Sequence, residues 1–113
     1  MKEIEIQSSI IQYLQILENQ NKIFFQRINN IPVYDSKHKK YRSMVKGGKK
    51  GFPDILILTA GKIIGLEVKS ETGKQSKEQK EIEKKFKQHG QEYFVVRSLQ
   101  EVIAILSEGS EYI

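Results

Sequence analysis

The feature that most constrains the fold of this chain is a pair of apolar runs separated by a short turn. The runs are Ile55–Thr59 and Ile63–Lys69, and Ala60-Gly61-Lys62 lies between them. Two short β-rich runs on either side of a glycine turn are typical of a hairpin. Because both runs are nearly continuous in apolar residues, we expect two central strands that are buried on both faces of a sheet.

The rest of the chain predicts helices and further strands around this hairpin. Apolar residues at helical spacing predict a helix from Glu3 to about Asn19, and Ile23–Ile28 is typical of a strand. Ser76, followed three residues later by Gln79, has the pattern of a capping box at the start of a second helix. A strand over Tyr93–Val96 and a last helix capped by Ser98 complete the chain. We therefore predict one α/β domain over residues 1–113, in the order α-β-β-β-α-β-α, with a mixed central sheet flanked by helices.

Residues 32–53 form a basic loop between the first predicted strand and the hairpin. The loop contains seven lysines and arginines and one acid, Asp35, in a chain of formal net charge +5. Cationic side chains favour a polyanionic partner because they release counterions from phosphates. We expect a nucleic acid to be bound by Arg27, Lys39, Lys40, Arg42, Lys46, Lys49 and Lys50. For any one of these residues, a solvated surface charge is the simpler interpretation.

Several protein classes are excluded by composition. The chain has no cysteine, which excludes disulfides, thiol catalysis and cysteine-based zinc sites. It also has no apolar run near the roughly 18 residues of a membrane span, and its first residues lack a signal-peptide pattern. We expect a cytoplasmic protein, of a bacterial or phage-infected cell, that does not bind membranes.

Glu67 is a charged residue at the end of an apolar strand, where a charge is unexpected. It follows Ile63-Ile64-Gly65-Leu66, and an ionised carboxylate there is costly unless it is paired or binds a metal. Glu67 and Lys69 share a face of the strand because side chains alternate. If the turn is centred on Gly61, facing positions sum to about 122, which places Asp54 near Val68 and diagonally beside Glu67 and Lys69. One alternative is a buried ion pair that satisfies itself, although two carboxylates for one lysine leave one without a partner.

The other alternative is a metal site at this end of the hairpin. The carboxylates of Asp54 and Glu67 are hard oxygen donors suited to Mg²⁺ or Mn²⁺, and the backbone carbonyl of Val68 is a further candidate ligand. Such an ion lowers the pKa of bound water and neutralises charge on a phosphate. Lys69 is placed to orient the water or to stabilise developing negative charge.

A resemblance to a known family supports the metal site. Gly51-Phe52-Pro53-Asp54, with Glu67-Val68-Lys69 after thirteen further positions, resembles the PD-(D/E)XK nuclease superfamily. The segment Gly73–Gln79 is similar to the VRR-NUC group of viral-type replication and repair nucleases, which includes small stand-alone phage and bacterial proteins. The resemblance implies a restriction-endonuclease-like fold, a metal held by Asp54 and Glu67, and Lys69 as the catalytic lysine.

The same resemblance implies two further catalytic residues, an acid on the first helix and a glutamine on the second. Glu3 lies on the apolar stripe of the first helix, whereas Glu5 is rotated away from it, so we favour Glu3. The glutamine is Gln79, for which a bond within the capping box is an equally good explanation.

The expected function is metal-dependent DNA cleavage by an endonuclease. Stand-alone members of this family are associated with branched DNA, including four-way (Holliday) junctions cleaved by a homodimer. Alternatives are a linear-duplex or RNA-directed nuclease on the same fold, or a non-catalytic nucleic-acid-binding module that retains a relic site.

Overall fold

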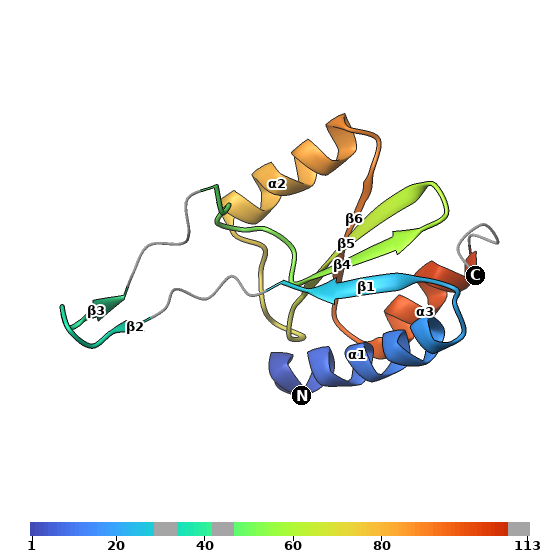
Figure 1. The fold of residues 1–113 in the computed structure, drawn as a ribbon, viewed down its shortest axis with the longest axis horizontal. Helices are drawn as coiled ribbons and strands as arrows, with labels where there is room; N and C mark the ends of the chain where they lie inside the picture. Colours follow the sequence, from blue (N-terminus) through green and yellow to red (C-terminus); the bar gives the residue numbers. More distant parts are fainter. Residues whose placement is uncertain (29–33, 42–46, 109–113) are drawn as a thin grey trace.

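The helices and strands follow the predicted order, with one addition. The computed structural model describes residues 1–28, 34–41 and 47–108 (Figure 1). Its elements are α1 (Glu3–Asn19), β1 (Phe24–Arg27), β2 (Tyr34–Asp35), β3 (Lys40–Tyr41), β4 (Ile55–Thr59), β5 (Lys62–Val68), α2 (Lys77–Gln88), β6 (Glu92–Val96) and α3 (Leu99–Glu108). The addition is a small antiparallel hairpin of β2 and β3 inside the segment that was predicted to be a loop. Figure 1 shows this hairpin standing apart from the main sheet.

The main sheet has the strand order β1-β4-β5-β6. Its first three strands are antiparallel neighbours, and β6 runs parallel to β5. The sheet is therefore mixed, as predicted. The parallel pair is joined through α2, because a parallel connection needs a crossover that returns the chain to the same end of the sheet.

The register of the central hairpin differs by one residue from the prediction. Ile55 pairs with Leu66 and Ile57 pairs with Ile64, so facing positions sum to 121 rather than 122. The turn contains two residues, Ala60 and Gly61, and Gly61 has a φ of +83°. The continued register places Asp54 opposite Glu67 and not opposite Val68.

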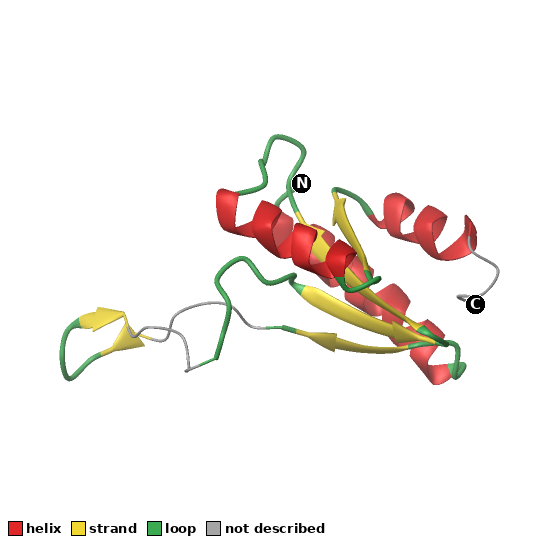
Figure 2. Cartoon of the chain, turned by 90° about the horizontal axis from the view of Figure 1, so that it is seen from above, coloured by secondary structure: helices red, strands yellow, loops and turns green. Residues whose placement is uncertain are grey.

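Helices cover the two faces of the sheet unequally. On one face, α1 and α3 pack side by side and enclose the core, whereas α2 alone lies on the other face (Figures 1 and 2). The core combines the apolar stripe of α1 with alternate residues of the central strands and with two residues of α3. Its fully enclosed side chains include Ile10, Leu14, Ile55, Ile57, Ile64, Leu66, Val68, Val96, Val102 and Leu106.

The expectation that both hairpin strands are buried on two faces is wrong for the end near the turn. Leu58 is 44% exposed and Ile63 is 36% exposed. Their neighbours Ile57 and Ile64 face the core, so both side chains project to the opposite face, which carries α2. Helix α2 packs against β6 and leaves the β4 side of this face open (Figure 1). In the part of the chain that the structure describes, no helix is long and apolar enough to cross a membrane.

Candidate metal centre

Asp54 and Glu67 lie side by side on the α2 face of the sheet. Residues that face each other in an antiparallel pair project to the same side, so the continued register brings the two carboxyls together. The backbone carbonyl of Asp54 accepts a hydrogen bond from the Ile28 N–H at 2.7 Å and is thus turned toward β1. Asp54 and Glu67 therefore form a non-hydrogen-bonded pair, the kind in which facing side chains approach most closely.

The Asp54 carboxylate is held in place by the strand that carries Glu67. Its Oδ2 accepts a hydrogen bond from the backbone N–H of Val68 at 2.8 Å. Since the N–H and C=O of one residue in a strand point the same way, the Val68 carbonyl also lies on the Asp54 side of β5. The three oxygen donors predicted from the sequence thus come from adjacent positions at one end of two paired strands.

Glu67 is a buried carboxyl with an unsatisfied oxygen. The residue is 3% exposed, and its Oε1 has no hydrogen-bond partner among the residues that the structure describes. Burial raises the pKa of Glu67 to about 9; the charge of Asp54, its hydrogen bond with the Glu67 carboxyl and the charge of Glu3 act in the same direction. Lys69 lowers this pKa, but its Nζ lies 4.0 Å from Glu67 Oε2. One ammonium cannot neutralise two carboxylates, which argues against an ion pair that satisfies itself.

The donor set fits a hard divalent cation. Mg²⁺ is usually bound by one or two carboxylates and keeps several waters. Asp54 and Glu67 supply two carboxylates, and the orphaned Oε1 of Glu67 is a buried oxygen that lacks a positive partner. Within residues 1–28, 34–41 and 47–108, no group of three or more His, Cys, Asp or Glu side chains is placed to hold a metal. Glu3 is therefore not gathered with Asp54 and Glu67 into one cluster.

The motif around Asp54 is fixed by close packing under α2. Gly51 has a φ of +88°, and a Cβ there would lie 2.7 Å from the backbone carbon of Glu78 in the first turn of α2. A Cβ on Gly65 would lie 2.7 Å from the Pro53 ring and 2.9 Å from the Phe86 ring. Only glycine fits at these two positions without a shift of its neighbours, so the approach of the chain to Asp54 is tightly determined.

The two further candidate catalytic residues are placed differently. Glu3 is exposed at the start of α1, and its charge is among those that raise the pKa of Glu67. Gln79 forms the predicted capping box: its Oε1 accepts from the Ser76 N–H at 2.8 Å, and its own N–H donates to Ser76 Oγ at 3.1 Å. The structural role of Gln79 is confirmed. Catalytic roles of Glu3 and Gln79 stay predictions.

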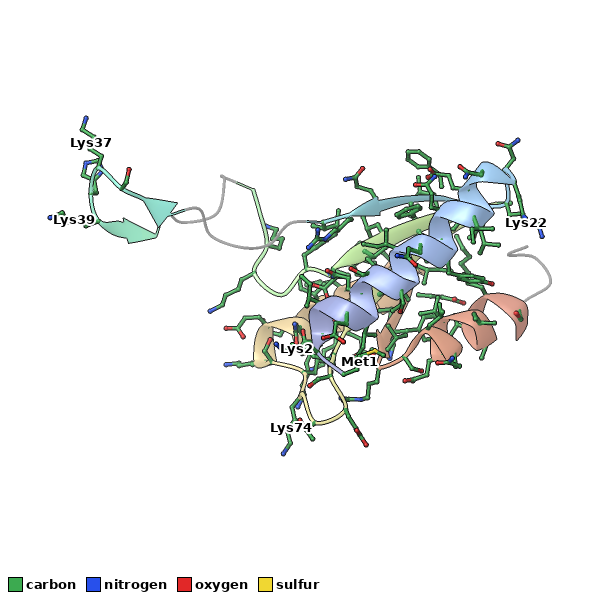
Figure 3. All side chains as sticks on the ribbon, turned by 90° about the horizontal axis from the view of Figure 1, so that it is seen from below. Met1, Lys2, Lys22, Lys37, Lys39 and Lys74 are labelled. Atoms are coloured by element: carbon green, nitrogen blue, oxygen red, sulfur yellow. The ribbon has the colours of Figure 1, made fainter. Side chains whose placement is uncertain are left out.

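The predicted nucleic-acid-binding residues fall into three groups. Arg27 is exposed and pairs with Ile55, next to Asp54, so it lies at the same end of the sheet as the carboxyl pair. Lys39 is exposed in the turn between β2 and β3 (Figure 3), and Lys49 and Lys50 are exposed before Gly51, with Lys50 Nζ 3.6 Å from a Glu78 oxygen. The structure describes the backbone of Lys40 in β3, and Arg42 and Lys46 lie outside the described residues.

Sequence reasoning missed two residues around the site. Tyr93 is buried on β6, and burial raises its pKa to about 12, with the nearby charges of Glu67 and Asp54 adding to the rise. Arg97 follows β6 and donates hydrogen bonds to the turn after Lys69. In the sequence, Tyr93 looks like an ordinary strand residue and Arg97 looks like an ordinary surface cation. Neither residue therefore stands out from its neighbours.

Comparisons with known proteins agree with the observed fold. The sequence profile of the VRR-NUC domain matches residues 5–100. A solved structure described as a VRR-NUC domain is similar to the fold, with a TM-score of 0.66 and 23% sequence identity over 95% of this chain and 96% of that one. No curated protein matches the sequence. The chain therefore belongs to the VRR-NUC family and is a nuclease-type domain of the PD-(D/E)XK superfamily.

Proposed function

We propose that this protein is an Mg²⁺- or Mn²⁺-dependent endonuclease that hydrolyses DNA phosphodiester bonds. The observation that carries the proposal is the Asp54–Glu67 pair, in which a carboxyl that is 3% exposed keeps an oxygen without a partner beside a second carboxyl. A protein keeps such a pair at a cost in stability. A divalent cation relieves that cost and gives the two acids a common role.

Four residues at the end of the hairpin are assigned separate roles in the reaction. The Asp54 and Glu67 carboxylates, with the Val68 carbonyl, would hold the ion, which when bound acidifies a water and neutralises phosphate charge. The Val68 N–H keeps Asp54 in its orientation. The Lys69 ammonium, 14% exposed and beside Glu67, orients the attacking water or stabilises the negative charge that develops on the phosphate.

Glu3 and Gln79 are proposed as auxiliary residues. Glu3 lies at the start of α1, and its negative charge contributes to the raised pKa of Glu67. Gln79 stands at the beginning of α2, above the Gly51–Asp54 segment. Its Oε1 is engaged in the capping box, so a contact with substrate would come from the amide nitrogen of the same side chain.

The basic residues are proposed to hold the DNA backbone. Arg27 lies at the end of β1 next to Asp54, and Lys39, Lys49 and Lys50 are exposed along the segment that leads to Asp54. Phosphate contacts of this kind position a nucleic acid without reading its sequence. We propose Lys40, Arg42 and Lys46 as further members of this surface.

Branched DNA, such as a four-way junction, is the proposed substrate, and a homodimer is the proposed active form. A domain of 113 residues has limited surface for two duplex arms, and a twofold dimer would present two sites to a symmetric junction. Such DNA occurs in the cytoplasm of bacterial or phage-infected cells, where we propose that the protein acts.

The test is a cleavage assay on linear, flap, fork and four-way DNA with Mg²⁺, Mn²⁺ or EDTA. Cleavage that needs a divalent ion and prefers the four-way substrate supports the proposal, as does loss of cleavage with retained DNA binding in Lys69→Ala. Asp54→Asn should weaken metal binding in calorimetry. Preference for linear duplex or RNA would contradict the substrate, and binding without metal-dependent cleavage would contradict the activity. Sedimentation of the protein with and without DNA tests the dimer.

A further inference from the structure

We propose that Arg97 is a positioning residue for the Lys69 ammonium, acting through the turn that follows β5. This inference rests on the proposed function, since it assigns a role within the same site. Arg97 is partly buried at the end of β6. It donates from one nitrogen, Nη1, to backbone carbonyls on the turn after Lys69, at 2.6 Å to Ser70 and at 2.7 Å to Gly73. A third carbonyl, that of Glu71, lies at 3.5 Å.

The turn held by Arg97 lies against the side chain of Lys69. The N–H of Gly73 donates to the Ser70 carbonyl at 3.2 Å and to its hydroxyl at 3.1 Å, which closes the turn. A Cβ on Gly73 would be in ordinary contact with Lys69 Cδ, at 3.5 Å, so the aliphatic part of the lysine passes Gly73 at a separation of about one methyl group. The position of this turn therefore limits the rotamers of Lys69, whose flexible four-carbon chain would otherwise place its ammonium over a wide volume.

The backbone of Arg97 is itself held in place by hydrogen bonds. Its backbone N–H donates to Glu101 Oε1 at 2.9 Å, and the Glu101 N–H donates to Ser98 Oγ at 3.2 Å, so the residue is built into the N-terminal cap of α3. The neighbouring Val96 carbonyl accepts from the Lys69 N–H at 2.9 Å. The backbone of Lys69 is thus fixed by Val96 at the end of β6, and its side chain is confined by a turn that the following residue, Arg97, holds.

A guanidinium suits this arrangement better than other side chains. The two hydrogens of its planar Nη1 group point in fixed directions, and the guanidinium stays charged at all relevant pH values. Charge-assisted bonds to converging carbonyls are shorter and stronger than neutral ones. Two bonds at 2.6 and 2.7 Å are in that short range. Removal of the guanidinium leaves the Ser70 and Gly73 carbonyls without this donor, and the turn is then free to move away from Lys69.

The test uses Arg97→Ala, the milder Arg97→Lys and the matched control Lys62→Ala. Lys62 is also a cation that donates to a loop carbonyl, that of Gly90 at 3.0 Å, but it lies at the opposite end of β5. Single-turnover cleavage at saturating DNA should fall about 10- to 100-fold in Arg97→Ala, because small misplacement of a catalytic group has effects of that size. The dissociation constant for DNA should stay unchanged, Arg97→Lys should keep part of the rate, and Lys62→Ala should cleave normally.

Two further measurements separate positioning from simple loss of structure. Added guanidinium ion at concentrations far below those that unfold proteins should restore part of the rate to Arg97→Ala and none to Lys69→Ala. Amide exchange at Gly73 should accelerate in Arg97→Ala while exchange at core residues of β5 stays slow. Normal cleavage by Arg97→Ala, or a loss confined to DNA affinity, would overturn the inference. Absence of cleavage by the unmodified protein would instead overturn the proposed function. Unchanged amide exchange at Gly73 in Arg97→Ala would show that Arg97 does not hold the turn, whatever the cleavage rate.

Discussion

Replacement of Glu67 by glutamine should change how the stability of the metal-free protein depends on pH. The pKa of Glu67 is raised from 4.5 to about 9, first by burial and then by Asp54. Below pH 4.5 the carboxyl is protonated in the folded and the unfolded chain alike. Between the two pKa values the folded chain keeps a proton that the unfolded chain releases, so the free energy of unfolding falls by about 1.4 kcal/mol per pH unit as pH rises. Above pH 9 this dependence ends.

The size of this effect is large compared with the stability of a small domain. From pH 5 to pH 8 the unmodified protein should lose about 4 kcal/mol through Glu67, whereas domains of this kind unfold with roughly 5–15 kcal/mol. The Glu67→Gln variant has a neutral side chain of the same shape and binds no proton in this range. Its stability should therefore vary much less over the same pH interval, and it should exceed that of the unmodified protein at pH 8.

The assay is urea unfolding in EDTA at several pH values between 5 and 8, with Glu5→Gln as a control for an exposed glutamate. If the two stability curves of the unmodified protein and Glu67→Gln run parallel, the reasoning about the buried carboxyl is refuted. Addition of Mg²⁺ or Mn²⁺ at pH 8 should then stabilise the unmodified protein by about 2.7 kcal/mol at a hundredfold excess over the dissociation constant. Glu67→Gln should gain much less, and equal gains would argue against Glu67 as a ligand.

Four further variants test packing, capping and the DNA surface. Gly65→Ala should lower the free energy of unfolding by about 1–3 kcal/mol, measured in urea, because its Cβ would lie 2.7 Å from the Pro53 ring. Ser76→Ala and Gln79→Ala each break the capping box and should cost about 1 kcal/mol; a much larger loss of cleavage rate in Gln79→Ala than in Ser76→Ala would assign the glutamine a catalytic role. Replacement of both Lys39 and Lys40 by alanine should reduce the steepness of a plot of the logarithm of the DNA-binding constant against the logarithm of the salt concentration by up to about 2. An unchanged slope would show that the β2–β3 hairpin does not contact DNA phosphates.

Local patterns account for the elements that the sequence predicted well. The helix Glu3–Asn19 is confirmed because its apolar stripe repeats over about three turns, from Ile6 to Leu17, and the stripe is the buried face. The capping box at Ser76 is confirmed because both of its bonds join residues three positions apart. The hairpin β2–β3 was not predicted. Each of its strands has two residues, too few for alternation to be recognised.

The candidate site was predictable only in part. Glu67 stands out in sequence because a charge interrupts an apolar strand, and the structure places it in a buried position. Arg97 has no comparable signal. Its partners are backbone carbonyls of Ser70 and Gly73, and every residue has such a carbonyl, so the contact leaves no mark on residue types 24 or more positions away. Contacts of this kind follow from the path of the chain, which is known only once the sheet is assembled.

The one-residue difference in hairpin register decides whether a metal centre is possible at all. If the numbers of facing residues summed to 122, Asp54 would oppose Val68, whose side chain lies in the core. Asp54 would then project to the core face, and the two carboxyls would lie on opposite faces of the sheet. With the observed sum of 121, the buried pairs Ile55–Leu66 and Ile57–Ile64 fill the core face, and Asp54 joins Glu67 on the other. A slip of β4 by one residue would turn Ile55 and Ile57 away from the core and toward α2. The apolar pairs that stabilise the hairpin are thus the same contacts that bring the two carboxyls together, and the geometry of the site is determined by the core beneath it.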